Sequence, residues 1–494
     1  MAIGGLDVGT TGCKLSAYDD KGNFIYSSYK EYEVSRHSGE HEIDANVIFD
    51  AVCTVIGDVA KKCTLSAIGV TTFGETFVIL DDEDKVLMPS MLYTDPRGEV
   101  ECAQLCDTLG EKRIIEIAGV KPHQMYSIAK MMWIKNNRPE IFERISKILL
   151  MEDFIVYMLT GNACIDYSLA ARTMALDIRK KCWSDEILGV AGIDKCLLSE
   201  PVPAFNVAGE LKKDIAEKLG IDTSVKIVNG AHDQVASAVG AGVFSVGCAV
   251  DGTGTVECIT PVFDKIPTEE KLYSEGYSVV PYVFEGTYVC YAFSFTGGAT
   301  IKWFRDNFSA DKSYAELDSS VSNEPTGILV LPHFAGAATP YMDNASKAAM
   351  IGLTLEHSSE DIYKALMEGV TYEIMTNVEH MESFGINPEK LYATGGGAYS
   401  DVWLQIKADI LNRPVTSLVA KEAGTCGTCM ITGVAVGIYK DLNEAKEMFV
   451  KEKKTYMPNP ENVKKYQKYY EAYKNIYDNV RPIVEIAEKG KKIC

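Results

Sequence analysis

Several features that would place this chain in a common class are missing from its 494 residues. No apolar run approaches the ~20 residues that a membrane-spanning helix needs. The N-terminus has no basic region followed by an apolar one, so we expect no signal peptide. No Gly-x4-Gly-Lys-Ser/Thr motif occurs, which excludes a P-loop enzyme. Low-complexity segments and long flexible linkers are missing too, so folded domains are expected throughout.

Positive charge is scarce as well, because the formal net charge is −20. This acidic excess argues against a nucleic-acid partner and against an anionic membrane surface. It does not exclude anionic substrates, since local loops set the potential of a binding site. We therefore expect a protein that binds neither nucleic acid nor membrane. A cytoplasmic location is expected on other grounds, which are the missing targeting signals and the reduced-looking cysteines.

The 14 cysteines are scattered through the chain. Only Cys426 and Cys429 have the spacing of a metal or redox pair, and no second pair accompanies them. Two interpretations stay open. The cysteines are small buried hydrophobic residues in a reducing compartment, or this pair has a redox or zinc-binding role.

The chain is too long for a single hydrophobic core, so two or three domains are expected. Strand-like runs alternate with helical patterns along it, which is typical of an α/β fold. The first domain is predicted to end near Gly242, which gives two domains at residues 1–243 and 244–494.

A β-hairpin at the N-terminus has a turn that could bind phosphate. An apolar run reaches Asp7, a Gly/Thr turn follows at residues 9–12, and a second alternating run continues from it. The glycines leave backbone N–H groups uncovered, Thr10 and Thr11 add hydroxyl donors, and Lys14 adds a positive charge. Such a concavity suits phosphate, and the Asp7 carboxylate suits a hydrated Mg²⁺. A purely structural turn is the alternative.

The same pattern returns at residues 247–256. A small apolar run leads to Asp251, the turn Gly252–Thr255 follows, and another apolar run comes after it. The two copies stand at corresponding points of two halves of the chain. Two similar halves, each with a Gly/Thr hairpin, predict the two lips of one phosphate-binding cleft.

Charged residues follow two of the predicted strands. Glu75 comes after the buried run Ile68–Val70, and Asp95 and Arg97 come after Ser90–Tyr93. Ligands gather at strand ends in α/β sheets, so these side chains are candidates for a site. Surface or capping roles are the alternative.

Two junctions between a strand and a helix add further candidates. A strand that ends at Val228 leads to Asp233, where an apolar helix opens. This carboxylate is either a helix N-cap or a catalytic base at the end of a sheet. Later, Gly395–Gly397 precede a helix that begins at Ser400. That loop either lets a ligand approach the backbone or lets the helix pack closely on the strand.

Two stretches resemble the signatures of the FGGY family of carbohydrate kinases, and the resemblance extends along essentially the whole chain. One stretch is Met125–Asn137, with Ser127, Lys130 and Trp133 in place; the other runs from Ala348 to Gly369. The order of the first hairpin, Asp233-Gln234, the second hairpin and the glycine loop also fits. The resemblance implies an α/β, two-domain actin/Hsp70/hexokinase-like (ribonuclease H-like) fold with an interdomain cleft. Residues 1–243 would bind the sugar, and residues 244–494 would bind the nucleotide.

The resemblance also implies a role for each candidate, with ATP and Mg²⁺ as cofactors. Asp233 would be the general base on the acceptor hydroxyl, and Asp7 would hold Mg²⁺ through water. Thr253 would meet the γ-phosphate. The substrate ligands would be Glu75, Asp95, Asp233 and Gln234. The nucleotide contacts would be Thr10, Thr11, Lys14, Thr253, Gly298, Lys302, Gly396, Gly397 and Ser400.

The chain departs from the subgroups of this family around the substrate. Xylulose kinases usually carry Met-His where this chain has Phe73-Gly74-Glu75. Glycerol kinases carry arginine in place of Gly74, and their substrate tyrosine aligns best with Met125. The identity of the sugar therefore stays open.

The sequence thus predicts in-line transfer of the ATP γ-phosphate to a primary hydroxyl of a small sugar or polyol. A ketopentose such as xylulose is the first candidate, and glycerol, another polyol or a sugar acid is the alternative. An actin- or Hsp70-like ATPase and a sugar-binding regulator are rivals from other classes. The kinase signatures argue against the first rival, and the presence of Asp7, Asp233 and Thr253 argues against the second. A homodimer is considered, although the sequence leaves the oligomeric state open.

Overall fold

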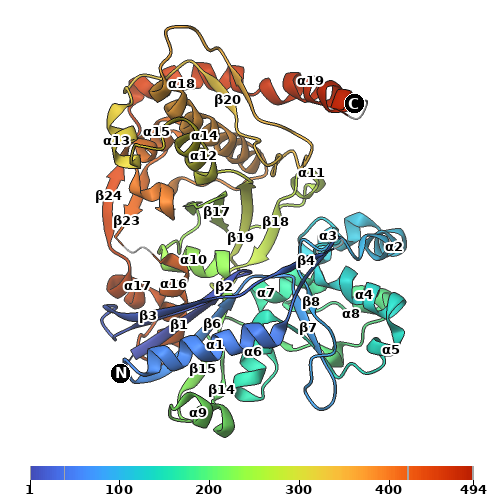
Figure 1. Cartoon of the computed structure of the whole chain (residues 1–494). Coiled ribbons are helices and arrows are strands. Elements are labelled where there is room, and N and C mark those ends of the chain that lie inside the picture. The colour runs from blue at the N-terminus through green and yellow to red at the C-terminus, as the bar shows by residue number, and fades with distance from the viewer. Residues whose placement is uncertain (1, 38, 420–421, 492–494) are drawn as a thin grey trace. The chain divides into compact units, whose positions relative to one another are not determined.

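The computed structural model describes residues 2–37, 39–419 and 422–491 (Figure 1). The chain forms two compact units, each built from three segments. The first unit comprises Met1–Gly242, Ser278–Val289 and Glu422–Lys451. The second unit comprises Val243–Tyr277, Cys290–Lys421 and Glu452–Cys494.

This division differs from the predicted cut between residues 243 and 244. The first segment ends at Gly242 as expected, but Ser278–Val289 and Glu422–Lys451 also belong to the first unit. The physical reason is packing, because α16 (Ala423–Ala435) lies against β1 (Ala2–Val8) of the first sheet. The hydrophobic pattern of a buried helix does not reveal which sheet covers it.

The first unit is built on a six-stranded sheet in the order β14-β15-β6-β1-β2-β3. The pairs β1–β2, β2–β3 and β14–β15 are antiparallel, whereas β1–β6 and β6–β15 are parallel. The strands that join β1 in this sheet are β2 (Gly12–Tyr18), β3 (Phe24–Glu31), β6 (Leu65–Thr72), β14 (Val207–Glu210) and β15 (Lys226–His232).

The other strands of the first unit form small sheets and pairs. They are β4 (Ser35–His37), β5 (Glu40–Ile43), β7 (Phe77–Leu80), β8 (Ser90–Met91), β9 (Lys147–Leu150), β10 (Cys164–Asp166), β11 (Leu176–Asp177), β12 (Cys182–Trp183) and β13 (Glu200–Val202). The strand β18 (Ser278–Pro281) belongs instead to a seven-stranded sheet.

The helices of the first unit surround these strands. They are α1 (Ala45–Ala60), α2 (Glu99–Leu109), α3 (Glu111–Ala118), α4 (Ser127–Asn137), α5 (Pro139–Phe142), α6 (Met151–Thr160), α7 (Tyr167–Ala170), α8 (Asp185–Ala191), α9 (Lys213–Leu219), α10 (Asp233–Gly240), α16 and α17 (Leu442–Phe449), with the 3₁₀ turns η1 (Ala171–Thr173) and η2 (Lys195–Leu197).

The two faces of β1 pack against different helices. Leu6 and Val8 join a hydrophobic core with α1, which Asp44 caps by accepting a hydrogen bond from the N–H of Asn46. On the other face, a Cβ added to Gly5 would lie 2.3 Å from the carbonyl oxygen of Thr425 in α16. Side chains alternate between the faces of a strand, so Asp7 lies on the same face as Gly5.

Backbone contacts hold α16 close to its neighbours. A Cβ at Gly427 would lie 1.9 Å from the carbonyl oxygen of Ala236 in α10. A Cβ at Gly240 of α10 would lie 1.8 Å from the carbonyl oxygen of Ala423. Real Cβ atoms do not approach backbone oxygens so closely, so only glycine lets these two helices meet.

The cysteine pair of α16 belongs to this packing. The thiol of Cys426 donates to the Tyr18 hydroxyl at 3.2 Å, and Sγ of Cys429 lies 3.7 Å from the carbonyl oxygen of Ile3. Burial raises the pKa of Cys426 to about 11 and that of Cys429 well above its ordinary value. Both thiols therefore stay protonated, which favours the structural interpretation over a redox or zinc role.

The second unit repeats the strand pattern of the first. Its strands belong to a seven-stranded sheet in the order β18-β19-β17-β16-β22-β23-β24. The pairs β16–β17 and β23–β24 are antiparallel, and the pairs β16–β22 and β22–β23 between them are parallel. The first sheet has the same order of pairs from β2 through β1, β6 and β15 to β14: antiparallel, parallel, parallel and antiparallel. The strands are β16 (Cys248–Thr253), β17 (Glu257–Phe263), β19 (Tyr288–Ser294), β22 (Lys390–Thr394), β23 (Val415–Leu418) and β24 (Glu452–Tyr456), beside the separate pair β20 (Leu329–Leu331) and β21 (Ala349–Ile351).

The long helix α14 (Ser359–Ser383) runs through the core of the second unit. Its buried residues pack with Phe304 of α12 (Gly298–Phe308) and with three buried tyrosines of α18 (Pro460–Tyr473), namely Tyr466, Tyr470 and Tyr473. The helices of this unit are α11 (Glu270–Ser274), α12 (Gly298–Phe308), α13 (Tyr314–Ser320), α14, α15 (Asp401–Leu411), α18 (Pro460–Tyr473) and α19 (Ile476–Lys491), with the 3₁₀ turn η3 (Gly396–Tyr399). In the part of the chain that the structure describes, no helix is both long and apolar enough to cross a bilayer.

The glycine contact between α16 and α10 gives a prediction about stability. In Gly427→Ala, the new methyl group must push the two helices apart, so we expect a loss of about 1–3 kcal/mol or more in the free energy of unfolding. Chemical denaturation measures this loss. The control is Gly57→Ala in α1, where nothing lies within 4 Å of the added Cβ. That variant should gain up to ~1 kcal/mol from helix propensity. Equal stability of the two variants would contradict the packing argument.

Candidate active site

The turn of the first hairpin presents unused hydrogen-bond donors. The N–H of Gly9 donates to the carbonyl oxygen of Gly12 at 2.9 Å, which closes the turn tightly. Thr10 and Thr11 lie between these glycines, and Thr11 is exposed. Among the described residues, the N–H and hydroxyl groups of both threonines have no hydrogen-bond partner. The turn therefore has the free donors that an anion requires.

Asp7 lies beside this turn and close to the beginning of α16. It pairs in register with Lys14 on β2. A Cβ at Gly424 would lie 3.2 Å from Oδ2 of Asp7. Lys14 itself pairs with Glu422, just before α16, with 2.7 Å between Nζ and Oε1. Both side chains of this pair are partly exposed, so the pair is weak and Lys14 can turn toward another anion.

Asp233 is the first residue of α10, directly after β15. The N-cap position is held by His232, which makes no side-chain capping bond. The Asp233 carboxylate accepts a hydrogen bond from the N–H of Gln234 at 2.6 Å, and 37% of the side chain is exposed. Asp233 is therefore not the N-cap, and its carboxylate remains partly open to a ligand.

Burial and charge give Asp7 and Asp233 unusual pKa values. Burial, followed by the charges of Asp233 and Glu422, raises the pKa of Asp7 to about 7, against the lowering effect of Lys14. Burial likewise raises the pKa of Asp233 to about 6, although the N–H of Gln234 and Arg172 lower it. Asp7 thus lies within the influence of two further carboxylates and one lysine, an arrangement that a divalent cation would stabilise.

The donor set fits a hydrated Mg²⁺ better than a directly bound metal. In the described ranges, no group of three or more His, Cys, Asp or Glu side chains is placed to hold a metal ion. Mg²⁺ keeps several of its water molecules and uses only one or two carboxylates. Asp7, with Asp233 and Glu422 near enough to raise its pKa, meets that requirement.

Glu75 lies in the turn after β6 and forms a buried ion pair with Arg172 of η1. Nε of Arg172 donates to Oε1 of Glu75 at 2.6 Å, and the two side chains are 7% and 6% exposed. The backbone of Glu75 has a φ of +65°, which is rare for this residue. The hydroxyl of Ser127 donates to the Glu75 carbonyl oxygen at 2.6 Å. The carboxylate is thus held in place by α4 and η1.

No side chain fits at Gly74, because Arg172 fills that space. A Cβ there would lie 2.8 Å from Cγ of Arg172 and 3.3 Å from Cδ2 of His232. Burial and the charge of Arg172 lower the pKa of His232 to about 3, so its ring is neutral. Nε2 of His232 lies 3.2 Å from Oδ1 of Asp233. Arg172 and His232 therefore connect Glu75 to Asp233.

Asp95 differs from the prediction that it binds substrate. It is 1% exposed, and its carboxylate accepts hydrogen bonds from the N–H of His41 at 2.8 Å and from Nε of Arg97 at 2.8 Å. Burial would raise the pKa of Asp95, but the bonds from Arg97 and His41 outweigh it and lower the pKa. The carboxylate braces its own loop and is not presented to a ligand. Gln234 lies half-buried at the second position of α10, next to Asp233.

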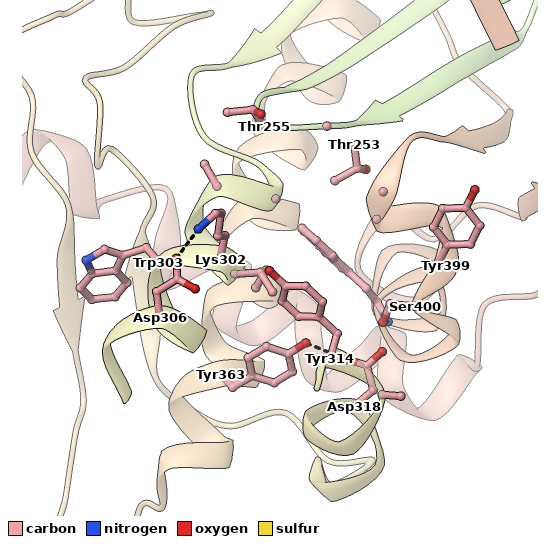
Figure 2. Close-up of a pocket in the computed structure, with 18 of the residues that line it drawn as sticks. Thr253, Thr255, Lys302, Trp303, Asp306, Tyr314, Asp318, Tyr363, Tyr399 and Ser400 are labelled. Carbon is pink, nitrogen blue, oxygen red and sulfur yellow. Dashed lines mark hydrogen bonds and ion pairs between the residues drawn. The ribbon is translucent and has the colours of Figure 1, made fainter. Parts of the chain in front are cut away.

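The second unit contains a cavity of about 910 Å³ (Figure 2). This volume is large enough for a nucleotide. The hairpin turn after β16, the first turns of α12 and α15, the 3₁₀ turn η3 and α13 line it. The structure brings together all six predicted nucleotide residues of this unit, which are Thr253, Gly298, Lys302, Gly396, Gly397 and Ser400.

Aromatic side chains that the sequence analysis did not assign line the same cavity. They are Tyr314 of α13, Tyr363 of α14 and Trp403 of α15. Figure 2 shows Tyr314 and Tyr363 near Asp318, and the Tyr363 hydroxyl donates to Oδ1 of Asp318 at 2.8 Å. Aromatic faces with a polar group at their edge suit a flat heterocyclic base.

The hairpin turn at this cavity is packed on two sides. The N–H groups of Gly297 and Gly298, where α12 begins, donate to the carbonyl oxygens of Thr255 and Gly254 at 2.9 and 2.8 Å. A Cβ at Gly397 would lie 2.6 Å from Cβ of Thr253. The glycine loop therefore packs closely on the hairpin and also lines the cavity.

Comparisons with known proteins identify the family. The model of the N-terminal domain of the FGGY family of carbohydrate kinases matches residues 2–240, and the model of the C-terminal domain matches residues 263–436. The chain belongs to the FGGY family of carbohydrate kinases. This confirms the family and the enzyme class that the sequence predicts.

Three relatives show how far the resemblance extends. A xylulose kinase from Lactococcus lactis is 29% identical over 98% of this chain and 99% of that protein. Two solved structures from Lactobacillus acidophilus, a ligand-bound xylulose kinase and a gluconate kinase, are each 27% identical, with a TM-score of 0.89 over 97% of this chain and 98% of theirs. The predicted two-domain actin/hexokinase-like fold is thereby confirmed.

Arg172 is the residue of this FGGY kinase that the sequence analysis most clearly missed. It is the only charged residue in the run Leu169–Leu176, which is the one signal that could have revealed it. A charged side chain in an apolar run either points to solvent or is paired inside the protein. Only the fold shows that its partner is Glu75, 97 positions away in the chain.

The buried Glu75–Arg172 pair gives a second prediction. In Arg172→Met, the Glu75 carboxylate stays buried without its cation, so we expect a loss of about 3–5 kcal/mol in the free energy of unfolding. The double variant Glu75→Gln/Arg172→Met should recover much of this loss, because no unpaired charge remains. The control is Arg113→Met, which removes an exposed pair with Glu186 and should change stability much less. Additive effects of the two substitutions would contradict the pairing.

Proposed function

We propose that this FGGY kinase transfers the γ-phosphate of ATP in line to a primary hydroxyl of a small sugar or polyol, with Asp233 as the general base. The first candidate for the acceptor is a ketopentose such as xylulose. The residues around Asp233 bind the acceptor, and the cavity of the second unit binds the nucleotide. Phosphoryl transfer depends mainly on positioning and on stabilisation of the phosphate charge.

The state of Asp233 is the observation that carries this proposal. A general base must be within reach of the hydroxyl, and its pKa should lie close to the working pH. The Asp233 carboxylate is partly exposed, and its pKa is raised to about 6. Asp95, by contrast, uses its oxygens within the protein. Of these two predicted acids, only Asp233 has a carboxylate open to accept a proton from a substrate.

The phosphate groups have donors in both hairpins. We assign Thr10, Thr11 and Lys14 to the phosphates on the first unit, together with the second turn around Thr253. Mg²⁺, when bound through water near Asp7, would neutralise charge on the phosphates. Tyr314 and Trp403 would hold the base of ATP, and Ser400 would lie near the ribose.

The acceptor is the least constrained part of the proposal. A relative of this chain is named a xylulose kinase, which supports the ketopentose. Another is named a gluconate kinase, and the Arg172 guanidinium could attract the carboxylate of a sugar acid. Glu75 already neutralises that guanidinium, so a neutral sugar is favoured. Glu75 and Arg172 are then left to contact hydroxyl groups of the sugar.

A substrate panel tests the function. We expect ADP release with ATP and Mg²⁺ to depend on one member of a panel that contains xylulose, ribulose, aldoses, glycerol and gluconate. In Asp233→Asn, turnover of that substrate should fall by about 10²–10⁴-fold, because no base accepts the hydroxyl proton. A coupled assay for ADP measures both rates.

The control variant for the panel is Asp82→Asn, which changes an exposed acid in a turn and should leave turnover unchanged. Sugar-independent ADP release would point to an ATPase instead. Nucleotide and sugar binding without any turnover would point to a regulator. Full activity in Asp233→Asn would refute the assigned base.

The raised pKa of Asp233 gives a prediction about pH. The base acts only when it is ionised, so kcat/KM should rise about tenfold per pH unit below 6 and level off above it. Saturating Mg²⁺ keeps Asp7 ionised during the measurement. Steady-state rates between pH 4.5 and 8.5 supply the profile. A profile that is flat across pH 5–7, or that falls with pH, would contradict the assignment.

A further inference from the structure

A buried group of three charged residues lies directly beneath the second hairpin turn. Lys407 comes from α15, Asp251 from β16 and Glu257 from β17, and their side chains are 1%, 0% and 0% exposed. The proposed function assigns no role to any of them. Apolar residues of similar volume would serve packing as well or better, so a buried ionic group calls for another reason.

Lys407 reaches the turn through the side chain of Thr253. Its Nζ lies 2.6 Å from Oδ2 of Asp251, 2.6 Å from Oγ1 of Thr253 and 2.8 Å from Oε1 of Glu257. An ammonium group has three protons and no acceptor, so it can only donate to the oxygens of Asp251 and Thr253. Oγ1 of Thr253 is therefore the acceptor, and its side chain is fixed toward the interior.

The charges of the cluster are balanced without solvent. Burial raises the pKa of Glu257 well above its ordinary value, and Asp251 raises it further, against the lowering effect of Lys407. A proton held by Glu257 leaves one negative charge beside the ammonium. The cluster is then neutral overall, which is the arrangement that a dry interior tolerates.

The anchored side chain leaves other groups of the turn exposed. Thr253 is 1% exposed, whereas Gly254 and Thr255 are exposed and line the cavity. Among the described residues, the N–H and hydroxyl groups of Thr255 have no hydrogen-bond partner. The turn thus faces the cavity with Thr255 (Figure 2), while the Thr253 side chain at its base is held by Lys407.

We propose that Lys407 is a positioning residue for the terminal phosphate of the nucleotide. Through the Thr253 hydroxyl it holds the turn Gly252–Thr255 in the conformation that presents donors to that phosphate. The inference rests on the proposed function, in which this turn meets the γ-phosphate. The Thr253 side chain anchors the turn to Lys407, and the exposed N–H and hydroxyl groups of Thr255 contact the phosphate.

The test compares a nucleotide that has a γ-phosphate with one that lacks it. Calorimetry gives the Kd of the full-length protein for an imido analogue of ATP and for ADP, both with Mg²⁺. We expect Lys407→Met to weaken binding of the analogue by about tenfold and to leave ADP within about twofold. Thr253→Val should give a similar change in the ratio of the two Kd values. The double variant should lose no more than either single variant, because both substitutions break one anchor.

The matched control is Lys364→Met in α14. Lys364 is also buried, at 2% exposed, and donates to the carbonyl oxygen of Ser322 at 2.8 Å, away from the nucleotide cavity. This control should leave the Kd ratio unchanged even where it lowers the melting temperature. If Lys407→Met does not fold, Thr253→Val alone decides, and an unchanged ratio there overturns the inference.

Other outcomes separate the two proposals. Equal weakening of both ligands in Lys407→Met, or additive losses in the double variant, would overturn the positioning role and leave the proposed kinase function intact. No binding of either nucleotide by the wild-type protein would overturn both. A changed ratio of the two Kd values in Lys407→Met, together with full turnover in Asp233→Asn, would support the positioning role of Lys407 and refute Asp233 as the catalytic base.

Discussion

The glycine-mediated approach of α16 to β1 and α10 is the constraint on which the candidate site of the first unit depends. At Gly427 and Gly240 the backbones of two helices meet with no space for a methyl group. Backbone contacts of this kind cannot adjust by a change of rotamer, so the position of α16 is fixed. The residues at its N-terminal end therefore stay beside Asp7, whose pKa is raised by burial first and then by the charges of Asp233 and Glu422.

The two Gly/Thr hairpins use the same strand pattern with different support. The first turn is closed by the bond from the N–H of Gly9 to the carbonyl oxygen of Gly12. Tyr32 donates to the carbonyl oxygens of Gly9 and Thr11. Within the described part of the chain, the donors of its two threonines are left open. The second turn is held by the N-terminus of α12, by the glycine loop and by Lys407. A phosphate site needs donors that do not have to reorganise when the charge arrives. In the second unit that rigidity comes from a buried ionic cluster, and the charge balance of the cluster makes it tolerable in the interior.

The acids at strand ends show how tertiary contacts separate similar residues. Asp95 is satisfied by Arg97 and His41, and Glu75 is paired with Arg172. Asp233 accepts one hydrogen bond from its own helix and keeps an exposed face. The chemistry of a carboxylate follows from which of its oxygens remain free. The pKa of Asp233 is then raised by burial to the range in which a base can work.

The amino-acid sequence alone determined the two hairpins, the alternation of strands and helices, the position of Asp233 at a strand-to-helix junction and the family. These features depend on local patterns of a few residues, which survive whatever packs around them. Only the tertiary structure decided that α16 belongs to the first unit, that Asp95 braces a loop, and that Arg172 and Lys407 reach Glu75 and Thr253. Such pairings join positions 97 and 154 residues apart. They depend on which faces meet in the folded chain, and no local pattern records that.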